Sequence, residues 1–209
     1  MYEIKNKEII LASASTSRQA MLQNANIRFT SRPAYIDEES IRQSAISEGI
    51  SLADCATLLA EIKGRRIAVA NPKAFIIASD QLLDSSGRCF SKPETLDKAK
   101  TQLSELQGKT HKLHTSVVVF LDGERIWHHL SSPIVTLRSL SKVEIDNYLN
   151  EIGNSAMQTP ASYQIENQGC HIIAQFSGAF YDILGLPLLP LLGFMRLHGL
   201  SPSSNTITQ

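Results

Sequence analysis

Residues 8–25 read EIILASASTSRQAMLQNA, and this stretch decides the fold class because a strand pattern changes into a helix pattern within it. The continuous apolar run at 8–13 predicts a short strand that is buried on both faces. The segment 17–25 predicts a helix, because its apolar residues fall on one side. The chain is therefore expected to begin with a buried strand followed directly by a helix.

Helices and strands continue to alternate along the rest of the chain. The further predicted elements are an extended segment at 27–40 around Pro33, a helix at 52–70, a strand at 74–79, a helix at 94–107, a hairpin around Asp122-Gly123, a helix that starts after Ser141 and a strand at 170–176. This order predicts a mixed α/β or α+β fold with a mixed sheet. The length allows one large domain or two small, interlocked ones, and we expect a flexible tail at 201–209.

The charge balance argues against two classes of partner. The chain has 20 basic and 20 acidic residues, so its formal net charge is zero. A neutral chain has no overall attraction for nucleic acid or for an anionic membrane. The longest apolar run, 183–195, is shorter than the ~20 residues that span a bilayer. We therefore expect no nucleic-acid polymer and no membrane as a partner, and no secretory signal at the N-terminus.

The cysteines favour a reducing compartment. Cys55, Cys89 and Cys170 are far apart and odd in number, and no CxxC pair occurs. Such a pattern is typical neither of a disulfide framework nor of a zinc ribbon. The cytoplasm is the predicted location.

The hydroxyl-rich segment of the opening stretch is a candidate phosphate-binding site. A helix start leaves backbone N–H groups unpaired and carries partial positive charge, so phosphate binds there readily. Ser13, Ser15 and Ser17 can add hydroxyl donors, and Arg18 can add a bidentate fork. The alternative is a serine N-cap beside a surface arginine. The segment lacks the glycines of a P-loop or of a dinucleotide fingerprint, which excludes both.

Two acidic segments are candidates for metal binding or proton transfer. Glu38 lies in IDEES, where carboxylates could hold Mg²⁺ together with substrate phosphate, or could form a solvated acidic loop. Asp80 follows the apolar run 74–79, at the end of which open α/β sheets place ligands. An Asx turn that closes the strand is the alternative for Asp80.

Two lysines could complete the site, whereas the histidines could not form a zinc centre. Lys63 and Lys92 could clamp a triphosphate together with Arg18, although each lysine alone is typical of a solvated surface. His111 and His114 lie in a predicted strand, where residues three apart face opposite sides and cannot share a metal. The adjacent histidines at 128 and 129 meet the same objection. The sequence contains no GxSxG motif, so it does not indicate a serine nucleophile.

Taken together, these segments resemble the Maf family of cytoplasmic nucleoside triphosphate pyrophosphatases over residues 8–198. The resemblance rests on the order of LASASTSR, IDEE, LLAEIKG, IIASDQ, SKP, QGKTHKLHT, LSKVEIDNYL and GLPL. It implies hydrolysis of a nucleotide between its α and β phosphates, with a divalent metal such as Mg²⁺ or Mn²⁺. The implied fold is a single domain at 1–200 with a twisted mixed central sheet flanked by helices and two interlocked lobes around a cleft, similar to that of inosine triphosphatases. Homodimers are common in the family.

The resemblance also assigns roles to individual residues. Asp80 matches the proton acceptor, and Glu38 matches an acidic residue that holds the metal with Asp80. The residues that match substrate-binding positions are Ser13, Ser15, Arg18, Lys63 and Lys92. Some members of the family have been linked to arrest of cell division, so a nucleotide-binding regulator of division that hydrolyses nothing is the alternative outside enzymes.

Within the resemblance, three further positions bear on which nucleotide is the substrate. Gln81 and Glu166 resemble the 7-methyl-GTP branch, and a carboxylate at 166 suits a cationic methylated guanine. Ser17 departs from the tryptophan that is frequent in that branch. Pyrimidine triphosphates such as dTTP and UTP, or other non-methylated nucleotides, are the alternative substrates. The chain also has TPAS at 159–162 where the family has an Ala-Gly stretch, which could alter the base pocket.

Overall fold

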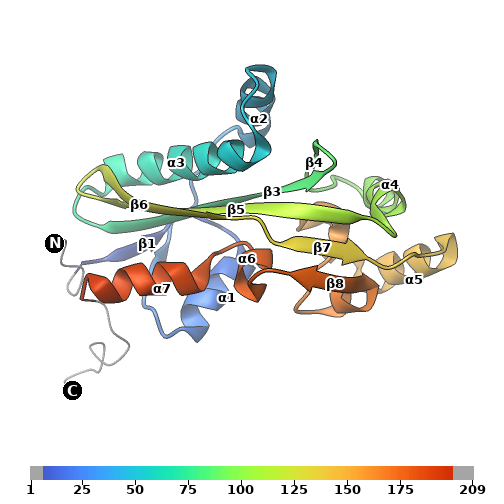
Figure 1. Ribbon diagram of the computed structural model, residues 1–209. Helices are drawn as coiled ribbons and strands as arrows, with labels where there is room; N and C mark the ends of the chain where they lie inside the picture. The colour runs from blue at the N-terminus through green and yellow to red at the C-terminus, as the bar shows by residue number, and fades with distance from the viewer. Residues whose placement is uncertain (1–6, 200–209) are drawn as a thin grey trace. The chain divides into compact units, whose positions relative to one another are not determined.

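The computed structural model describes residues 7–199. Its elements are β1 (Ile9–Leu11), α1 (Thr16–Asn24), β2 (Thr30–Ser31), α2 (Glu38–Ser47), α3 (Leu52–Ala70), β3 (Phe75–Ser85), β4 (Arg88–Phe90), α4 (Leu96–Leu106), β5 (Thr110–Leu121), β6 (Glu124–Ser131), β7 (Ile134–Leu137), α5 (Lys142–Ile152), η1 (Gly153–Met157), η2 (Pro160–Ser162), η3 (Gln168–Ile172), β8 (Ile173–Ser177), α6 (Phe180–Ile183) and α7 (Leu188–Leu197) (Figure 1).

The strands form a mixed sheet, which confirms the predicted α/β class. The order β2-β1-β3-β5-β7-β8 runs through the sheet, and β4 and β6 pair with β3 and β5. β1 is parallel to β2 and β3, whereas β7 is antiparallel to both β5 and β8. The described residues divide into two compact units. The first unit holds 7–80, 115–131 and 185–199, and the second unit holds 81–114 and 132–184.

In the first unit, helices cover both faces of the strands. α3 lies on one face, and α1 and α7 lie on the other (Figure 1). Gly64 lets α3 approach β5 closely, because a Cβ at this position would lie 2.6 Å from the Phe120 ring. On the opposite face, Phe194 of α7 stacks on Trp127 of β6 with ring centroids 4.9 Å apart. This packing holds the strands that carry the candidate site.

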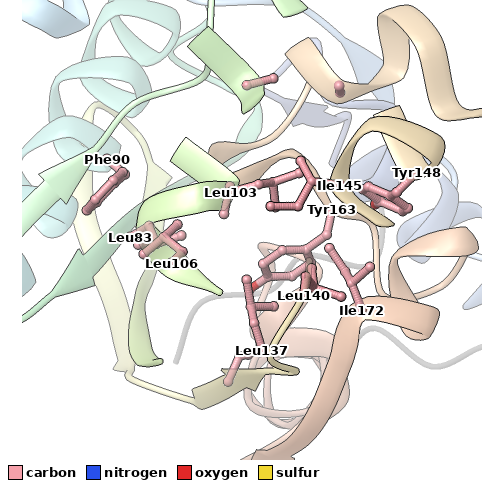
Figure 2. Close-up of a cluster of buried hydrophobic side chains, with 14 of the residues drawn as sticks. Leu83, Phe90, Leu103, Leu106, Leu137, Leu140, Ile145, Tyr148, Tyr163 and Ile172 are labelled. Carbon is pink, nitrogen blue, oxygen red and sulfur yellow. The ribbon is translucent and has the colours of Figure 1, made fainter. Parts of the chain in front are cut away.

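The second unit has a core of its own. Figure 2 shows the side chains that α4, α5 and the segment 160–172 pack against the strands, among them Leu103, Ile145 and Tyr163. The predicted capping box starts α5, since the Ser141 hydroxyl accepts from the Glu144 N–H and the Glu144 carboxylate accepts from the Ser141 N–H. This core supports the long segment between α5 and β8.

Three local predictions were wrong or incomplete. Residues 38–40, expected to be extended, begin α2, because the Asp37 side chain caps the helix by accepting from the Ser40 N–H. The strand expected at 74–79 continues as β3 to Ser85, so Asp80 lies within a strand and does not close it with an Asx turn. The strand expected at 170 begins at Ile173, since residues 168–172 form a 3₁₀ turn.

Two expectations concern the ends of the chain and the membrane. The predicted flexible tail at 201–209 lies outside the described residues. Among residues 7–199, no helix combines the length and the apolar character that a membrane crossing requires.

Candidate active site

A lysine lies between two carboxylates in the first unit. Lys63 comes from the middle of α3, Asp80 from β3, and Glu38 from the first turn of α2. The Lys63 Nζ is 2.7 Å from Glu38 Oε1, and it also donates to Asp80 Oδ1. Lys63 and Asp80 are buried, whereas the Glu38 side chain is 51% exposed. Three segments that are distant in the sequence therefore meet at one cation.

The surroundings of Asp80 set its affinity for a proton. Burial raises the pKa of Asp80 above its ordinary value, and the neighbouring Glu38 adds to the rise. Lys63 and Arg18 act in the opposite direction and lower this pKa by favouring the carboxylate. Burial therefore makes Asp80 a stronger proton acceptor than an exposed carboxylate, and the two neighbouring cations favour its ionised form.

The hydroxyl-rich segment forms the start of α1. The Ser15 side chain caps the helix by accepting from the Arg18 N–H at 3.4 Å, and the Ser13 hydroxyl accepts from the Ser15 N–H at 3.2 Å. The serine cap that sequence left as an alternative is therefore present. This cap orients the first turn of α1. The phosphate-binding role of the segment stays a prediction.

Arg18 is a half-buried residue, not the surface arginine of the alternative interpretation. Its Nη1 donates to the Ser79 carbonyl at 2.8 Å, and its Nε donates to the Gly185 carbonyl at 2.7 Å. Ser79 directly precedes Asp80, so the guanidinium holds the backbone beside the acidic side chain. These contacts use two of the five N–H donors, and a third reaches the Ser13 hydroxyl at 3.3 Å.

Ser79 and Gly185 are site residues that sequence reasoning missed. The Ser79 hydroxyl lies 2.9 Å from the Gly185 carbonyl and 2.7 Å from the Ser116 carbonyl, so β3, β5 and the segment before α7 meet at this side chain. Gly185 has φ +97, and a Cβ there would lie 3.4 Å from the Arg18 guanidinium. Ser79 lies in the motif IIASDQ, and Gly185 lies in the motif GLPL. Neither motif indicates that the hydrogen bonds of the site are made to backbone carbonyls.

The two carboxylates suit a metal ion that is shared with a substrate. Among residues 7–199, no group of three or more His, Cys, Asp or Glu side chains could hold a metal. Mg²⁺ is often held by one or two carboxylates, with water and substrate phosphate completing its shell. Glu38 and Asp80 already converge on one positive charge, which is the donor arrangement that such an ion needs.

Three of the remaining predicted residues, Gln81, Lys92 and Glu166, belong to the second unit. Lys92 follows β4 and is exposed, and Glu166 is exposed in the turn between η2 and η3. The Gln81 side-chain nitrogen donates to the carbonyls of Asp182 and Ile183 at 2.9 and 3.1 Å. Gln81 therefore holds α6, while the convergence of these three residues with Asp80 stays a prediction. Ser17 lies in the first turn of α1 in the first unit.

The histidines and cysteines have structural surroundings. His111 contacts the Tyr163 hydroxyl at 2.8 Å, and His114 contacts Ser132 at 2.8 Å and Asp84 at 3.2 Å. The two rings thus have separate hydrogen-bond partners. Among the described residues, no disulfide joins Cys55, Cys89 and Cys170.

Comparisons with known proteins agree with the motif order. A family model described as Maf-like protein matches residues 8–198. A nucleoside triphosphate pyrophosphatase from Rhodospirillum rubrum is 41% identical over 191 residues, which cover 91% of this chain and 95% of the relative. One from Granulibacter bethesdensis is 40% identical, with 91% and 97% covered. A 7-methyl-GTP pyrophosphatase from Brucella abortus is 36% identical over 189 residues, with 90% and 95% covered.

Proposed function

The chain belongs to the Maf-like protein family, and on this premise we propose that it is a nucleoside triphosphate pyrophosphatase. The reaction cleaves the bond between the α and β phosphates and yields a nucleoside monophosphate and pyrophosphate. The observation that carries the proposal is the meeting of Glu38, Lys63 and Asp80 beside the capped start of α1. Acidic groups, a buried cation and a helix start are what hydrolysis of a polyphosphate requires.

Asp80 takes the role of general base. A water that attacks the α phosphorus must lose a proton, and Asp80 is a buried carboxylate whose pKa is raised by burial. Arg18 holds the Ser79 carbonyl, so the strand segment that presents Asp80 is fixed in place. The pyrophosphate leaves with its charge neutralised by the cationic side chains of the site.

A divalent metal ion, Mg²⁺ or Mn²⁺, fits the two converging carboxylates and would be held by Glu38 and Asp80. When bound, the ion supplies positive charge to the phosphate oxygens. Lys63, the buried cation between these carboxylates, would then neutralise charge on the polyphosphate. In the first unit, Arg18 and the hydroxyl groups of Ser13 and Ser15 complete the phosphate contacts, and Lys92 of the second unit stays a proposed substrate contact.

The proposed substrate is 7-methyl-GTP. The Brucella abortus relative carries this name at 36% identity, and Glu166 offers a carboxylate that a cationic base would favour. Gln81 and Ser17 are the other proposed specificity positions. Hydrolysis of dTTP, UTP or another non-methylated nucleotide is the second candidate, because the relatives with 40% identity or more carry no base in their names.

A substrate panel tests both levels of the proposal. Purified protein is incubated with 7-methyl-GTP, GTP, dTTP and UTP, with Mg²⁺, Mn²⁺ or chelator, and phosphate is measured with and without added inorganic pyrophosphatase. We expect signal only with the added enzyme and with metal, and the largest kcat/KM for 7-methyl-GTP. Faster turnover of dTTP or UTP would reject the methylated substrate, and binding without turnover would support the regulator of division. The homodimer and the cytoplasmic location stay predictions.

A further inference from the structure

A set of buried hydrogen bonds in the second unit lies outside the catalytic cluster. His111 Nε2 of β5 is 2.8 Å from the Tyr163 hydroxyl, and the Tyr148 hydroxyl of α5 donates to the Ser162 carbonyl at 3.0 Å. The Thr159 hydroxyl donates to the Tyr163 carbonyl at 2.8 Å. His111, Ser162 and Tyr163 are buried, at 2%, 1% and 6% exposure. Three different side chains therefore anchor two consecutive residues.

The backbone is strained at the first anchored residue and at the residue before it. Ala161 and Ser162 have φ values of 58° and 56°, in the left-handed region that L-residues other than glycine avoid. Such strain persists only where surrounding contacts impose it, and it is concentrated at functional sites. The hydrogen bonds to Ser162 and Tyr163 are the contacts that impose it here.

The turn that follows, residues 164–169, is held by contacts between its own residues. The Asn167 N–H donates to the Gln164 carbonyl at 3.0 Å, and the Asn167 side chain donates to the Gln164 amide oxygen at 2.9 Å. Gly169 lies so close to Gln164 that a Cβ would meet its carbonyl oxygen at 2.5 Å. Ile165 points into the core of the unit. The backbone at Glu166 therefore lies between a core side chain, Ile165, and a hydrogen-bonded residue, Asn167.

We propose that His111, Tyr148 and Tyr163 are positioning residues that fix the 164–169 turn and thereby determine which base the enzyme accepts through Glu166. The inference rests on the proposed function, because it assumes that Glu166 contacts the base. It assigns selectivity to a buried hydrogen-bond set that touches no substrate. The set is suited to this role since neutral buried hydrogen bonds are directional and fix geometry without attracting ions.

The positioning role differs in its effects from a purely structural one. Loss of general stability lowers the activity toward all nucleotides by the same factor. A displaced turn changes the contact with the base and leaves the phosphates and the attacking water unaffected. The ratio of kcat/KM between 7-methyl-GTP and GTP therefore reports the positioning role, whereas kcat for a single nucleotide does not.

The test uses two substitutions that remove one hydroxyl each and keep the ring. Tyr163→Phe removes the partner of His111, and Tyr148→Phe removes the donor to Ser162. Tyr181→Phe is the matched control, because Tyr181 is 37% exposed and lies in the same unit. The full chain is studied by hydrogen exchange of peptides that cover 164–169, and by the selectivity ratio. Peptides that cover α4 serve as the internal reference.

We expect each test variant to raise exchange in the turn by about fivefold, the effect of one lost hydrogen bond, with α4 unchanged. The selectivity ratio should fall by a similar factor, and Tyr181→Phe should change neither quantity. Faster exchange in the turn with an unchanged ratio would overturn the link to selectivity. Equal acceleration in the turn and in α4, or no acceleration in either variant, would overturn the positioning role. A wild-type protein without hydrolytic activity would instead overturn the proposed function, and the exchange experiment would then decide the positioning role alone.

Discussion

The Lys63 cluster of the first unit and the His111 cluster of the second unit are both buried polar sites, but they differ in charge. Lys63 lies between two carboxyl groups, and Arg18 lies nearby, so the first cluster is built from acidic and basic side chains. In the second cluster, burial lowers the pKa of His111 to about 4, and it raises the pKa of Tyr163 above its ordinary value. Its members are therefore neutral near pH 7.

This difference matches what each cluster is proposed to do. Buried ion pairs are costly to form and contribute little net stability, so their presence favours a role in binding or catalysis. Neutral hydrogen bonds in the core satisfy buried polar groups and specify one backbone geometry. A charged cluster can exchange its internal cation for a ligand, whereas a neutral cluster holds a segment in place. The predictions below test whether this distinction is correct.

The largest expected effect concerns Asp80. Asp80→Asn removes the proton acceptor and a carboxylate that would hold the metal, and we expect kcat/KM to fall by roughly 1,000-fold. The measurement is pyrophosphate release at saturating metal, with circular dichroism to verify the fold. Asp122→Asn is the control, because Asp122 is an exposed hairpin residue with φ 51° that asparagine also adopts. Full activity of the Asp80→Asn protein would contradict the assignment.

The neutrality of His111 predicts a pH-dependent stability. The unfolded histidine binds a proton below about pH 6.5, whereas the buried ring, with a pKa of about 4, does not. The unfolded state therefore binds more protons in this window, and the free energy of unfolding should fall by about 3 kcal/mol between pH 6.5 and pH 4. In denaturant unfolding, the His111→Gln protein should lack this pH-dependent fall in the free energy of unfolding. The His128→Gln protein, changed at an exposed histidine, should keep it. Identical pH profiles for wild type and His111→Gln would show that the ring is not buried in neutral form.

Lys63 should control both the rate and its pH dependence. Lys63→Met removes a cation that lowers the pKa of Asp80, so this pKa rises. Asp80 must be deprotonated to act as a base, and the acid limb of the pH–rate profile should therefore move to higher pH. We expect kcat/KM near neutral pH to fall by about 100-fold. Lys73→Met, at an exposed lysine, is the control. An acid limb at the same pH in Lys63→Met and wild type would show that Lys63 does not affect the pKa of Asp80.

The smallest expected effect concerns the strained turn. Ala161→Gly relieves a left-handed alanine but adds freedom to the unfolded chain, so the free energy of unfolding should rise by about 0.5 kcal/mol. Ala20→Gly, in the middle of α1, should lower it by about 1 kcal/mol. Urea unfolding of both variants gives the comparison. A decrease for Ala161→Gly as large as that for Ala20→Gly would mean that the turn carries no strain.

The parts of the fold that depend on local pattern could be predicted. The helix at 52–70 and the capping box of Ser141 and Glu144 follow from nearby residues, and the structure has both. The start of β8 could not be predicted, because the 3₁₀ turn at 168–172 depends on the close approach of Gly169 to Gln164. The start of α2 was missed although Asp37 is a good N-cap residue, since Pro33 favoured an extended chain throughout this region.

The candidate site could be predicted only in part for a similar reason. Each of Glu38, Lys63 and Asp80 belongs to a recognisable motif, but periodicity does not reveal that one lysine contacts both carboxylates. The carbonyl partners of Arg18 are backbone atoms, which carry no sequence signal. The contact between His111 and Tyr163 joins residues 52 positions apart, and only packing of the second unit brings them together.

Hydrolysis in ¹⁸O-labelled water tests the central claim most directly. If Asp80 activates a water that attacks the α phosphorus, mass spectrometry should find the label in the nucleoside monophosphate and none in the pyrophosphate. The Asp80→Asn protein should incorporate label at a rate lower by roughly 1,000-fold. Label in the pyrophosphate, or release of a nucleoside diphosphate with labelled phosphate, would contradict the account.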